Sequence, residues 1–223
     1  MSIRLVVFDM AGTTVHDDGV VNDCLRQVLQ EAGVVVDRAA VNAVMGEPKP
    51  VAIAKLLNEH PRPDSDEVRR LYARFESVMV SHYAASPNVR PVEGAEETFR
   101  ALKAHGISVA LDTGFNRTVV DAILRRLDWW GASFIDATVA SDEVERGRPH
   151  PDLIRRAMRL TGIAHDSDVA KVGDTPSDLL EVTAAGCSKV IGITSGSHGR
   201  SSLEQYPHTD LVDSLQEVPP LCI

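Results

Sequence analysis

Four short apolar runs, each followed by a polar residue, constrain the fold of this chain more than any other feature of its sequence. They span residues 3–8, 107–111, 169–172 and 190–193. Runs of this kind, rich in Val and Ile, are typical of strands that are buried on both faces. Because helix-like patterns separate the runs, we expect an α/β fold with a parallel sheet, whose polar strand ends meet at one edge.

The bulk composition sets the size and the kind of core. With 223 residues, 43% of them hydrophobic, the chain can form one α/β domain and a smaller appended domain. Aromatic residues make up only 4% of the chain, so the core is expected to be aliphatic and helix-rich, which disfavours a β-sandwich.

A long segment, from about residue 20 to residue 88, carries helix-like patterns and no strand pattern of comparable quality. The predicted helices span residues 21–32, 38–45, 51–59 and 65–85, and the last begins with a cap-like DSDE sequence. We therefore predict two domains. Residues 1–18 and 89–223 form a core around a Rossmann-like parallel sheet, and residues 19–88 form an inserted all-helical domain.

Charge and cysteine content exclude several classes of partner. The net charge is −9 and the 23 Lys and Arg residues are scattered, which argues against binding to nucleic acid or to an anionic membrane. No apolar run approaches the ~20 residues that span a bilayer. Cys24, Cys187 and Cys222 are widely spaced and odd in number, as in intracellular proteins without disulfides. We expect a soluble cytoplasmic protein that binds a small anionic ligand.

The first strand ends at a carboxylate that opens a turn of small residues. Asp9 is followed by Met-Ala-Gly-Thr-Thr, so Gly12 and Thr13 lie in a turn with hydroxyl groups and free backbone amides, which can hold a phosphate. Taken alone, an Asp after a strand is more often a turn or cap residue. The ends of the other strands decide between the two interpretations.

Those strand ends carry further polar groups in a consistent order. Thr113 follows the second strand, within Asp-Thr-Gly, and Arg148 lies in a GRPHPD turn before a helix. Asp174 and Asp178 follow a later strand and are four residues apart, so a helix that begins at Pro176 would direct both toward one cavity. A set of unrelated caps and turns explains each residue alone but not their order on successive strand ends.

Clustered carboxylates repel one another unless a cation lies between them, and hard oxygen ligands suit Mg²⁺. Such an ion would hold Asp9 beside a phosphoryl group, and the carboxylate would attack phosphorus to form an acyl phosphate that water hydrolyses. Thr113 and Arg148 would bind the remaining phosphoryl oxygens.

In this order, the motifs resemble those of the haloacid dehalogenase superfamily over essentially the whole chain. Two departures from its phosphatases matter: Ala11 replaces the second Asp of the first motif, the general acid that protonates an oxygen leaving group, and Arg148 replaces the usual Lys. With the DMAGTT string, they are similar to the phosphonatase branch, which holds phosphonoacetaldehyde hydrolase and its relatives. A carbon leaving group needs no such acid if it is released as an enamine.

This resemblance implies a cap domain, here residues 19–88, and a Schiff-base lysine within it. The MGEPK string (residues 45–49) is similar to the family string that carries this lysine, which points to Lys49. On its own, Lys49 would be interpreted as a solvated lysine at a helix start. The resemblance further implies that Asp9, Ala11 and Asp174 bind Mg²⁺ with Asp178 behind them, and that substrate contacts come from Gly12, Thr13, Met45, Gly114 and Phe115.

The chain also departs from the family enzyme near the lysine. The family has a His three residues after it and a Tyr after the Thr-Gly of the second motif, where this chain has Ala52 and Phe115, and the family's Cys shortly after the first motif is also missing. His16 is near in sequence and could take part in proton transfer, although a solvated or capping role fits it as well.

Three functions stay open at this point. The first is hydrolysis of the C–P bond of a 2-oxo-alkyl phosphonate with Asp9 and Lys49. The second is phosphate monoester hydrolysis through Asp9 alone, with Lys49 at most a cationic clamp. The third is noncatalytic binding of a phosphometabolite. Many relatives dimerise through their caps, so a homodimer through the helix at residues 65–85 is a further expectation, and residues 194–202 are expected to form a loop at the sheet edge.

Overall fold

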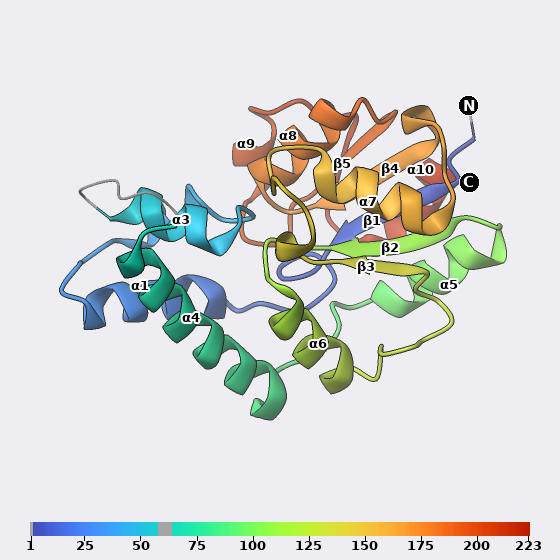
Figure 1. The fold of residues 1–223 in the computed structure, drawn as a ribbon. Helices are drawn as coiled ribbons and strands as arrows, with labels where there is room; N and C mark the ends of the chain where they lie inside the picture. The colour runs from blue at the N-terminus through green and yellow to red at the C-terminus, as the bar shows by residue number, and fades with distance from the viewer. Residues whose placement is uncertain (1, 58–63) are drawn as a thin grey trace.

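The computed structural model describes residues 2–57 and 64–223 and is built around a six-stranded sheet. All neighbouring strands are parallel, in the order β3-β2-β1-β4-β5-β6 (Figure 1). This confirms the predicted α/β fold with a Rossmann-like parallel sheet. The strands are β1 (Leu5–Asp9), β2 (Ser108–Asp112), β3 (Ala137–Val139), β4 (Val169–Gly173), β5 (Lys189–Ile193) and β6 (Asp210–Val212).

The four predicted strands are β1, β2, β4 and β5, the central part of this sheet. The sequence did not indicate β3 and β6, which have three residues each and lie at the two edges. Both strands are short and not all of their residues are buried, so neither forms a continuous apolar run.

Ten α-helices connect or flank the strands in the described part of the chain. They are α1 (Val20–Glu31), α2 (Arg38–Asn42), α3 (Lys49–Leu56), α4 (Asp66–Ala85), α5 (Ala95–Ala104), α6 (Arg117–Arg126), α7 (Asp152–Thr161), α8 (Pro176–Ala185), α9 (Arg200–Leu203) and α10 (Pro219–Cys222). Short 3₁₀ helices span Ser141–Glu143, Asp166–Asp168 and Leu215–Glu217.

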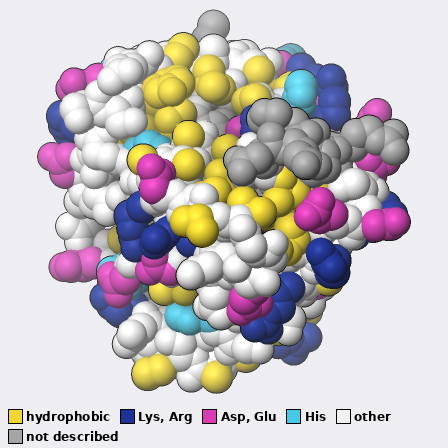
Figure 2. Space-filling view, turned by 90° about the vertical axis from the view of Figure 1, so that its left-hand side faces the viewer, with side chains coloured by type: hydrophobic (Ala, Val, Ile, Leu, Met, Phe, Trp, Pro, Cys, Tyr) yellow, Lys and Arg dark blue, Asp and Glu magenta, His cyan; other side chains and the backbone are white. Residues whose placement is uncertain are grey.

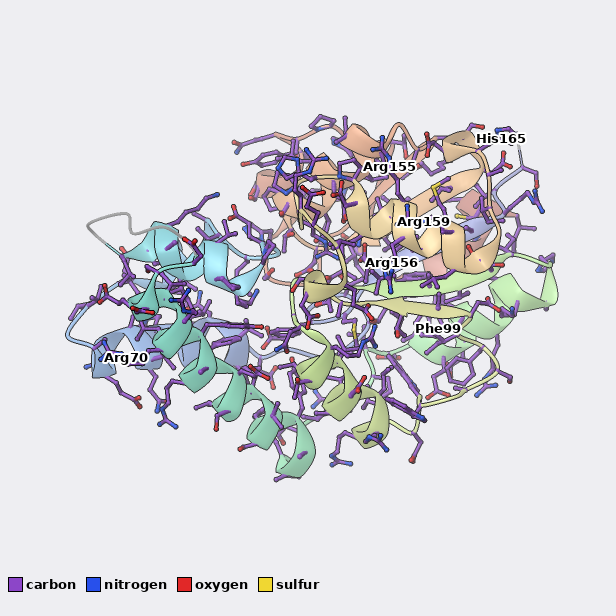
Figure 3. The ribbon with its side chains drawn as sticks, viewed as in Figure 1. Arg70, Phe99, Arg155, Arg156, Arg159 and His165 are labelled. Carbon is purple, nitrogen blue, oxygen red and sulfur yellow. The ribbon has the colours of Figure 1, made fainter. Side chains whose placement is uncertain are left out.

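Side chains of alternate strand residues enter two separate hydrophobic cores. Val6 and Phe8 of β1 belong to one core, together with residues of α5 and α6, whereas Leu5 and Val7 belong to the other, with residues of α7 and α8. Phe99 lies on α5 (Figure 3). Its ring packs edge-on against that of Phe8, with ring centroids 5.1 Å apart. The sheet is therefore covered by helices on both faces, as the apolar strands predicted.

Helices α1 to α4 follow one another without an intervening strand among the described residues, and they lie to one side of the sheet (Figure 1). Ser65 caps α4 by accepting a hydrogen bond from the Val68 amide, as the DSDE sequence predicted. The division into a core and a cap at residues 18/19 and 88/89 stays a prediction.

Two helix boundaries in this segment differ from the prediction by more than one residue. Helix α2 ends at Asn42 instead of residue 45, because the chain turns into Gly46, whose φ is +82°. Helix α3 begins at Lys49, two residues early, since Pro50 lies in its first turn, where no backbone donor is needed. The end predicted for this helix, at residue 59, lies outside the described residues.

On the face that α1 to α4 present, hydrophobic side chains lie among acidic and basic ones (Figure 2). A homodimer through this face stays a prediction. Across the described residues, no helix combines the length and the apolar character needed to cross a membrane.

Candidate active site

The sheet brings the predicted strand-end residues together at its carboxyl edge. Asp9 ends β1 and is the register partner of Asp112, which ends β2, so Thr113 lies one residue beyond this pair. On the other side β1 pairs with β4, which is followed directly by Asp174. Asp9 and Asp174 are buried, and so are Asp112 and Thr113.

The turn after Asp9 is more closed than expected. The amides of Thr13, Thr14 and Val15 all donate to the Met10 carbonyl, and the Gly12 amide donates to the Val15 carbonyl. The expectation of free amides in this turn is therefore wrong from Gly12 onward. The turn instead faces Asp174: Thr13 donates its hydroxyl to Asp174 Oδ1 at 3.0 Å. Substrate contacts by Gly12 and Thr13 stay a prediction.

Arg148 lies at the centre of a network of carboxylates. Its side chain is fully buried, and its Nη1 contacts Asp9 Oδ1 at 2.7 Å and Asp178 Oδ1 at 2.9 Å. Its Nη2 contacts Asp112, and its Nε donates to Glu181 Oε2 at 2.9 Å. Every nitrogen of the Arg148 guanidinium contacts a carboxylate, among them that of the nucleophile candidate Asp9. Contact of Arg148 with phosphoryl oxygens stays a prediction.

Sequence reasoning missed two members of this network. Lys171 is fully buried within β4, where its Nζ contacts Asp112 and approaches Asp178 Oδ1 at 3.1 Å. Glu181 is fully buried on α8, and its Oε2 lies 3.8 Å from Lys171 Nζ. A signal was present, because a lysine within a strand that is buried on both faces needs a partner.

The buried acidic groups outnumber the buried basic ones. Asp9, Asp112, Asp174, Asp178 and Glu181 face only three basic side chains, those of Arg148, Lys171 and Lys49, so the site would carry two excess negative charges with all of these groups ionised. Burial raises the pKa of Asp9 to about 7, an effect that Arg148 opposes and Asp178 and Asp174 reinforce. A divalent cation would relieve this excess.

Three of these carboxylates can share such a cation. One oxygen atom each from Asp9, Asp174 and Asp178 lie within 4.8 Å of one another. Asp178 is already held by Arg148 and Lys171, which outweigh the effect of burial and lower its pKa. Carboxylate oxygens of this kind suit Mg²⁺. Of the predicted ligands, Ala11 has only its backbone carbonyl to offer.

Asp174 is held in place by the loop that follows β5. The sequence predicted a loop at the sheet edge here but indicated no function for it. Residues 194–199 follow β5, and there Ser197 donates both its amide, at 2.7 Å, and its hydroxyl, at 2.6 Å, to Asp174 Oδ2. Gly12 and Gly196 pack so tightly against Asp174 that a Cβ atom at either position would overlap its carboxylate. Ser197 was not predicted.

Helix α8 begins at Pro176, as predicted, and orients Asp178. The Thr175 hydroxyl donates to Asp178 Oδ2 at 2.6 Å, and the Asp178 amide donates back to Thr175, which together cap the helix. The position of Asp178 close to Asp9 and Asp174 thus follows from the start of this helix. Its place behind the metal ligands stays a prediction.

Lys49 is buried, with only 4% of its surface exposed, which overturns the interpretation of a solvated lysine. Its Nζ donates to the Glu47 carbonyl at 3.2 Å and lies 5.2 Å from the centre of the Phe115 ring. Burial lowers the pKa of Lys49 to about 8, while the charge of Asp9 acts in the opposite direction. The charge of Asp9 therefore acts on Lys49, although Lys49 lies on α3 and Asp9 lies on β1.

Phe115 connects the helical segment with the sheet edge. Its ring stacks on Phe75 and meets Tyr83 edge-on, with centroids 6.3 and 5.9 Å away, and both partners come from α4. At Gly114, a Cβ atom would lie only 2.6 Å from the Glu47 carbonyl oxygen, so this position brings the lysine-bearing turn close to β2. Met45 is buried in the same core. Substrate contacts by these residues stay a prediction.

His16 does not join this group. Its Nε2 pairs with Asp18 at 2.7 Å, beside a cavity of about 570 Å³ that is also lined by Arg90 and Glu93. The role in proton transfer that was considered for His16 gains no support from this geometry.

A parallel α/β sheet with a nucleophile candidate, a fixed guanidinium and a carboxylate cluster at its carboxyl edge is an arrangement that suits a hydrolase. The family model described as haloacid dehalogenase-like hydrolase matches residues 3–186. The chain belongs to this family, as the motifs predicted.

Single proteins are also similar to this chain over most of its length. A phosphonoacetaldehyde hydrolase of Bacillus cereus is 27% identical to this chain over 235 residues, which cover 98% of the chain and 86% of that protein. A phosphonoacetaldehyde hydrolase-like protein from Oleispira antarctica has a similar structure, with a TM-score of 0.84 and 20% identity over 100% of this chain and 92% of that one. A putative phosphoglycolate phosphatase from Lactobacillus delbrueckii subsp. bulgaricus is also similar in structure, with a TM-score of 0.81 and 16% identity. The match covers 100% of this chain and 99% of that one. The two structures show that the fold is shared.

Proposed function

We propose that this protein hydrolyses the C–P bond of a 2-oxo-alkyl phosphonate, with phosphonoacetaldehyde as the first candidate substrate. The observation that carries the proposal is the burial of Lys49 in the environment of Asp9. The name of the relatives that match most of the chain at 27% to 29% identity points to the same substrate.

Lys49 has the properties that a Schiff-base lysine needs. An amine attacks a carbonyl carbon only in its neutral form, and at a pKa of about 8 a useful fraction of Lys49 is neutral near pH 7. In an ordinary lysine, with a pKa near ~10.4, the neutral fraction would be about two hundredfold smaller. The same burial that lowers the pKa keeps water away from the imine.

Lys49 would act on the carbonyl carbon of the substrate and Asp9 on its phosphorus, and one carbon atom lies between these two atoms. Lys49 forms an iminium with the substrate carbonyl, and Asp9 attacks phosphorus. The electron pair of the C–P bond then moves into the carbon chain to give an enamine, while an acyl phosphate remains on Asp9. Water hydrolyses the acyl phosphate, and the protonated enamine is hydrolysed from Lys49.

The other residues hold and balance these groups. Arg148 keeps Asp9 oriented through the 2.7 Å contact between Nη1 and Oδ1. Asp9, Asp174 and the Ala11 carbonyl would hold Mg²⁺, which supplies positive charge to the phosphoryl oxygens when bound. Ala11 cannot protonate an oxygen leaving group, which favours a carbon leaving group.

The test is reductive trapping. Incubation with phosphonoacetaldehyde and borohydride should attach the two-carbon chain to Lys49, and peptide mass spectrometry should find Lys55, more exposed on the same helix, unmodified. Lys49→Arg keeps the charge but cannot form an imine, so its turnover of phosphonoacetaldehyde should fall at least ~100-fold.

Normal phosphate release without an adduct on Lys49 would refute the Schiff-base mechanism. If Lys49→Arg and Lys49→Ala kept turnover of p-nitrophenyl phosphate while phosphonates were not cleaved, the protein would be a phosphate monoesterase that acts through Asp9. Mg²⁺-dependent ligand binding without any phosphate release would indicate a noncatalytic binding protein.

A further inference from the structure

Glu47 lies two residues before Lys49, and its carboxylate is largely buried. Its side chain is 12% exposed, and Lys55 holds Oε1 at 2.7 Å. The other oxygen, Oε2, is buried without a hydrogen-bond partner among the residues that the structure describes. Buried carboxylate oxygens in native proteins are almost always paired, so an unpaired one next to a reactive group requires an explanation.

Glu47 and Lys49 are in direct contact through the backbone. The Lys49 ammonium donates to the Glu47 carbonyl at 3.2 Å, and the Glu47 charge raises the pKa of Lys49 against the dominant effect of burial. The same carbonyl packs on Gly114 at the end of β2. The turn therefore fixes the Glu47 backbone, and the carboxylate would reach Nζ only if the side chain rotated away from Lys55.

Imine formation requires a group that moves protons. The amine must lose a proton before it attacks, and the oxygen of the carbinolamine must gain one before it leaves as water. Neither Ala52 nor Phe115 can accept or donate a proton, although both stand at positions close to the lysine in sequence or in space.

Other titratable groups near Lys49 fit this role less well. Burial keeps the pKa of Tyr83 well above its ordinary value, so its hydroxyl does not accept a proton near neutral pH. Asp17 accepts a hydrogen bond from the Val20 amide at 2.7 Å, at the start of α1. His16 is paired with Asp18.

We infer that Glu47 is the catalytic acid and base for formation of the Lys49 Schiff base. The inference rests on the proposed function and adds a residue to it. Glu47 takes a proton from the Lys49 ammonium, and the neutral amine forms the C–N bond with the carbonyl carbon. A proton then passes from nitrogen to oxygen, which gives the neutral carbinolamine. Glu47 returns its proton to the hydroxyl group, water leaves, and the nitrogen electron pair completes the iminium.

The experiment measures the rate at which borohydride traps phosphonoacetaldehyde on Lys49. Glu47→Gln keeps the shape of the side chain but cannot transfer protons, so trapping should slow about 100-fold or more. In Glu47→Ala, added formate should restore part of the rate, because a small carboxylate can take the place of the missing side chain. Rescue by formate would not be seen if Glu47 only stabilised the turn.

Lys55→Met is the matched control, because it removes the ion pair at Oε1 and leaves Glu47 in place. Its trapping rate should stay within a few-fold of wild type. Equal losses in Lys55→Met and Glu47→Gln would show that only the ion pair matters and would overturn the inference. Wild-type trapping in Glu47→Gln would also overturn it. Absence of an adduct in the wild-type protein would instead refute the proposed function itself.

Discussion

At the scale of single residues, the position of Asp174 depends on side chains from two different loops. Thr13 holds Oδ1 and Ser197 holds Oδ2, the latter with two short hydrogen bonds. Groups that orient a metal-binding carboxylate typically contribute about 10- to 100-fold to metal affinity. We therefore predict that Ser197→Ala weakens Mg²⁺ binding about 10- to 100-fold, as measured by isothermal titration calorimetry.

Ser195→Ala is the control for this prediction, because Ser195 lies in the same loop and is exposed. Its Mg²⁺ affinity should equal that of the wild type. Equal affinity in Ser197→Ala and wild type would show that the Ser197 amide and Thr13 fix Asp174 without the Ser197 hydroxyl.

The residues that could be predicted are those whose position follows from a strand end. Asp9, Thr113 and Asp174 each follow an apolar run, and the parallel sheet places them together without further information. Lys171 and Glu181 could not be assigned in this way, because their role depends on Asp112 and Arg148, which lie far away in the sequence. The role of Ser197 could not be predicted either, because the sequence of a polar loop does not indicate which strand end the loop contacts.

At the scale of elements, the turn between α2 and α3 is the link between the helical segment and the sheet edge. Gly46 packs against Thr175, the Glu47 carbonyl against Gly114, and Pro48 against Gly147. The sequence pattern predicted the two helices, but it extended the first one into this turn. The contacts of the turn with three loops of the sheet could not be predicted, because they depend on long-range packing.

We predict that Gly46→Ala reduces phosphonate turnover about 100-fold. A Cβ atom at position 46 would overlap the Thr175 hydroxyl, and the residue has a φ of +82°, so the turn must move away from the sheet edge and carry Lys49 with it. Displacement of a catalytic group by about 1 Å can cost a factor of this size. Steady-state kinetics would measure the effect.

Gly33→Ala separates backbone strain from displacement. Gly33 has nearly the same φ, +83°, but a Cβ atom there would meet no other atom within 4 Å. Both variants should lose about 1–2 kcal/mol of unfolding free energy from the left-handed conformation. If Gly33→Ala lost as much activity as Gly46→Ala, reduced stability and not the position of the turn would be the cause.

At the scale of the whole molecule, the excess of buried carboxylates makes stability depend on pH. Burial raises the pKa values of Asp9, to about 7, and of Asp174. Between the ordinary carboxyl pKa near ~4 and a pH of about 7, the folded protein therefore holds protons that the unfolded chain releases. In this range, these two groups make the free energy of unfolding fall as the pH rises, and Mg²⁺ should reverse the loss because it binds the ionised carboxylates.

We therefore predict that Mg²⁺ raises the melting temperature more at pH 8 than at pH 5. At a concentration one hundred times the dissociation constant, a ligand adds about 2.7 kcal/mol to the free energy of unfolding. For a chain of this size, that corresponds to an increase of roughly 5–10 °C in differential scanning calorimetry at pH 8. At pH 5 protons compete for Asp9 and Asp174, so the increase should be much smaller. Asp174→Asn should lose most of the effect at pH 8, since it removes one ligand charge. An equal increase at both pH values would mean that Mg²⁺ binds outside this carboxylate cluster.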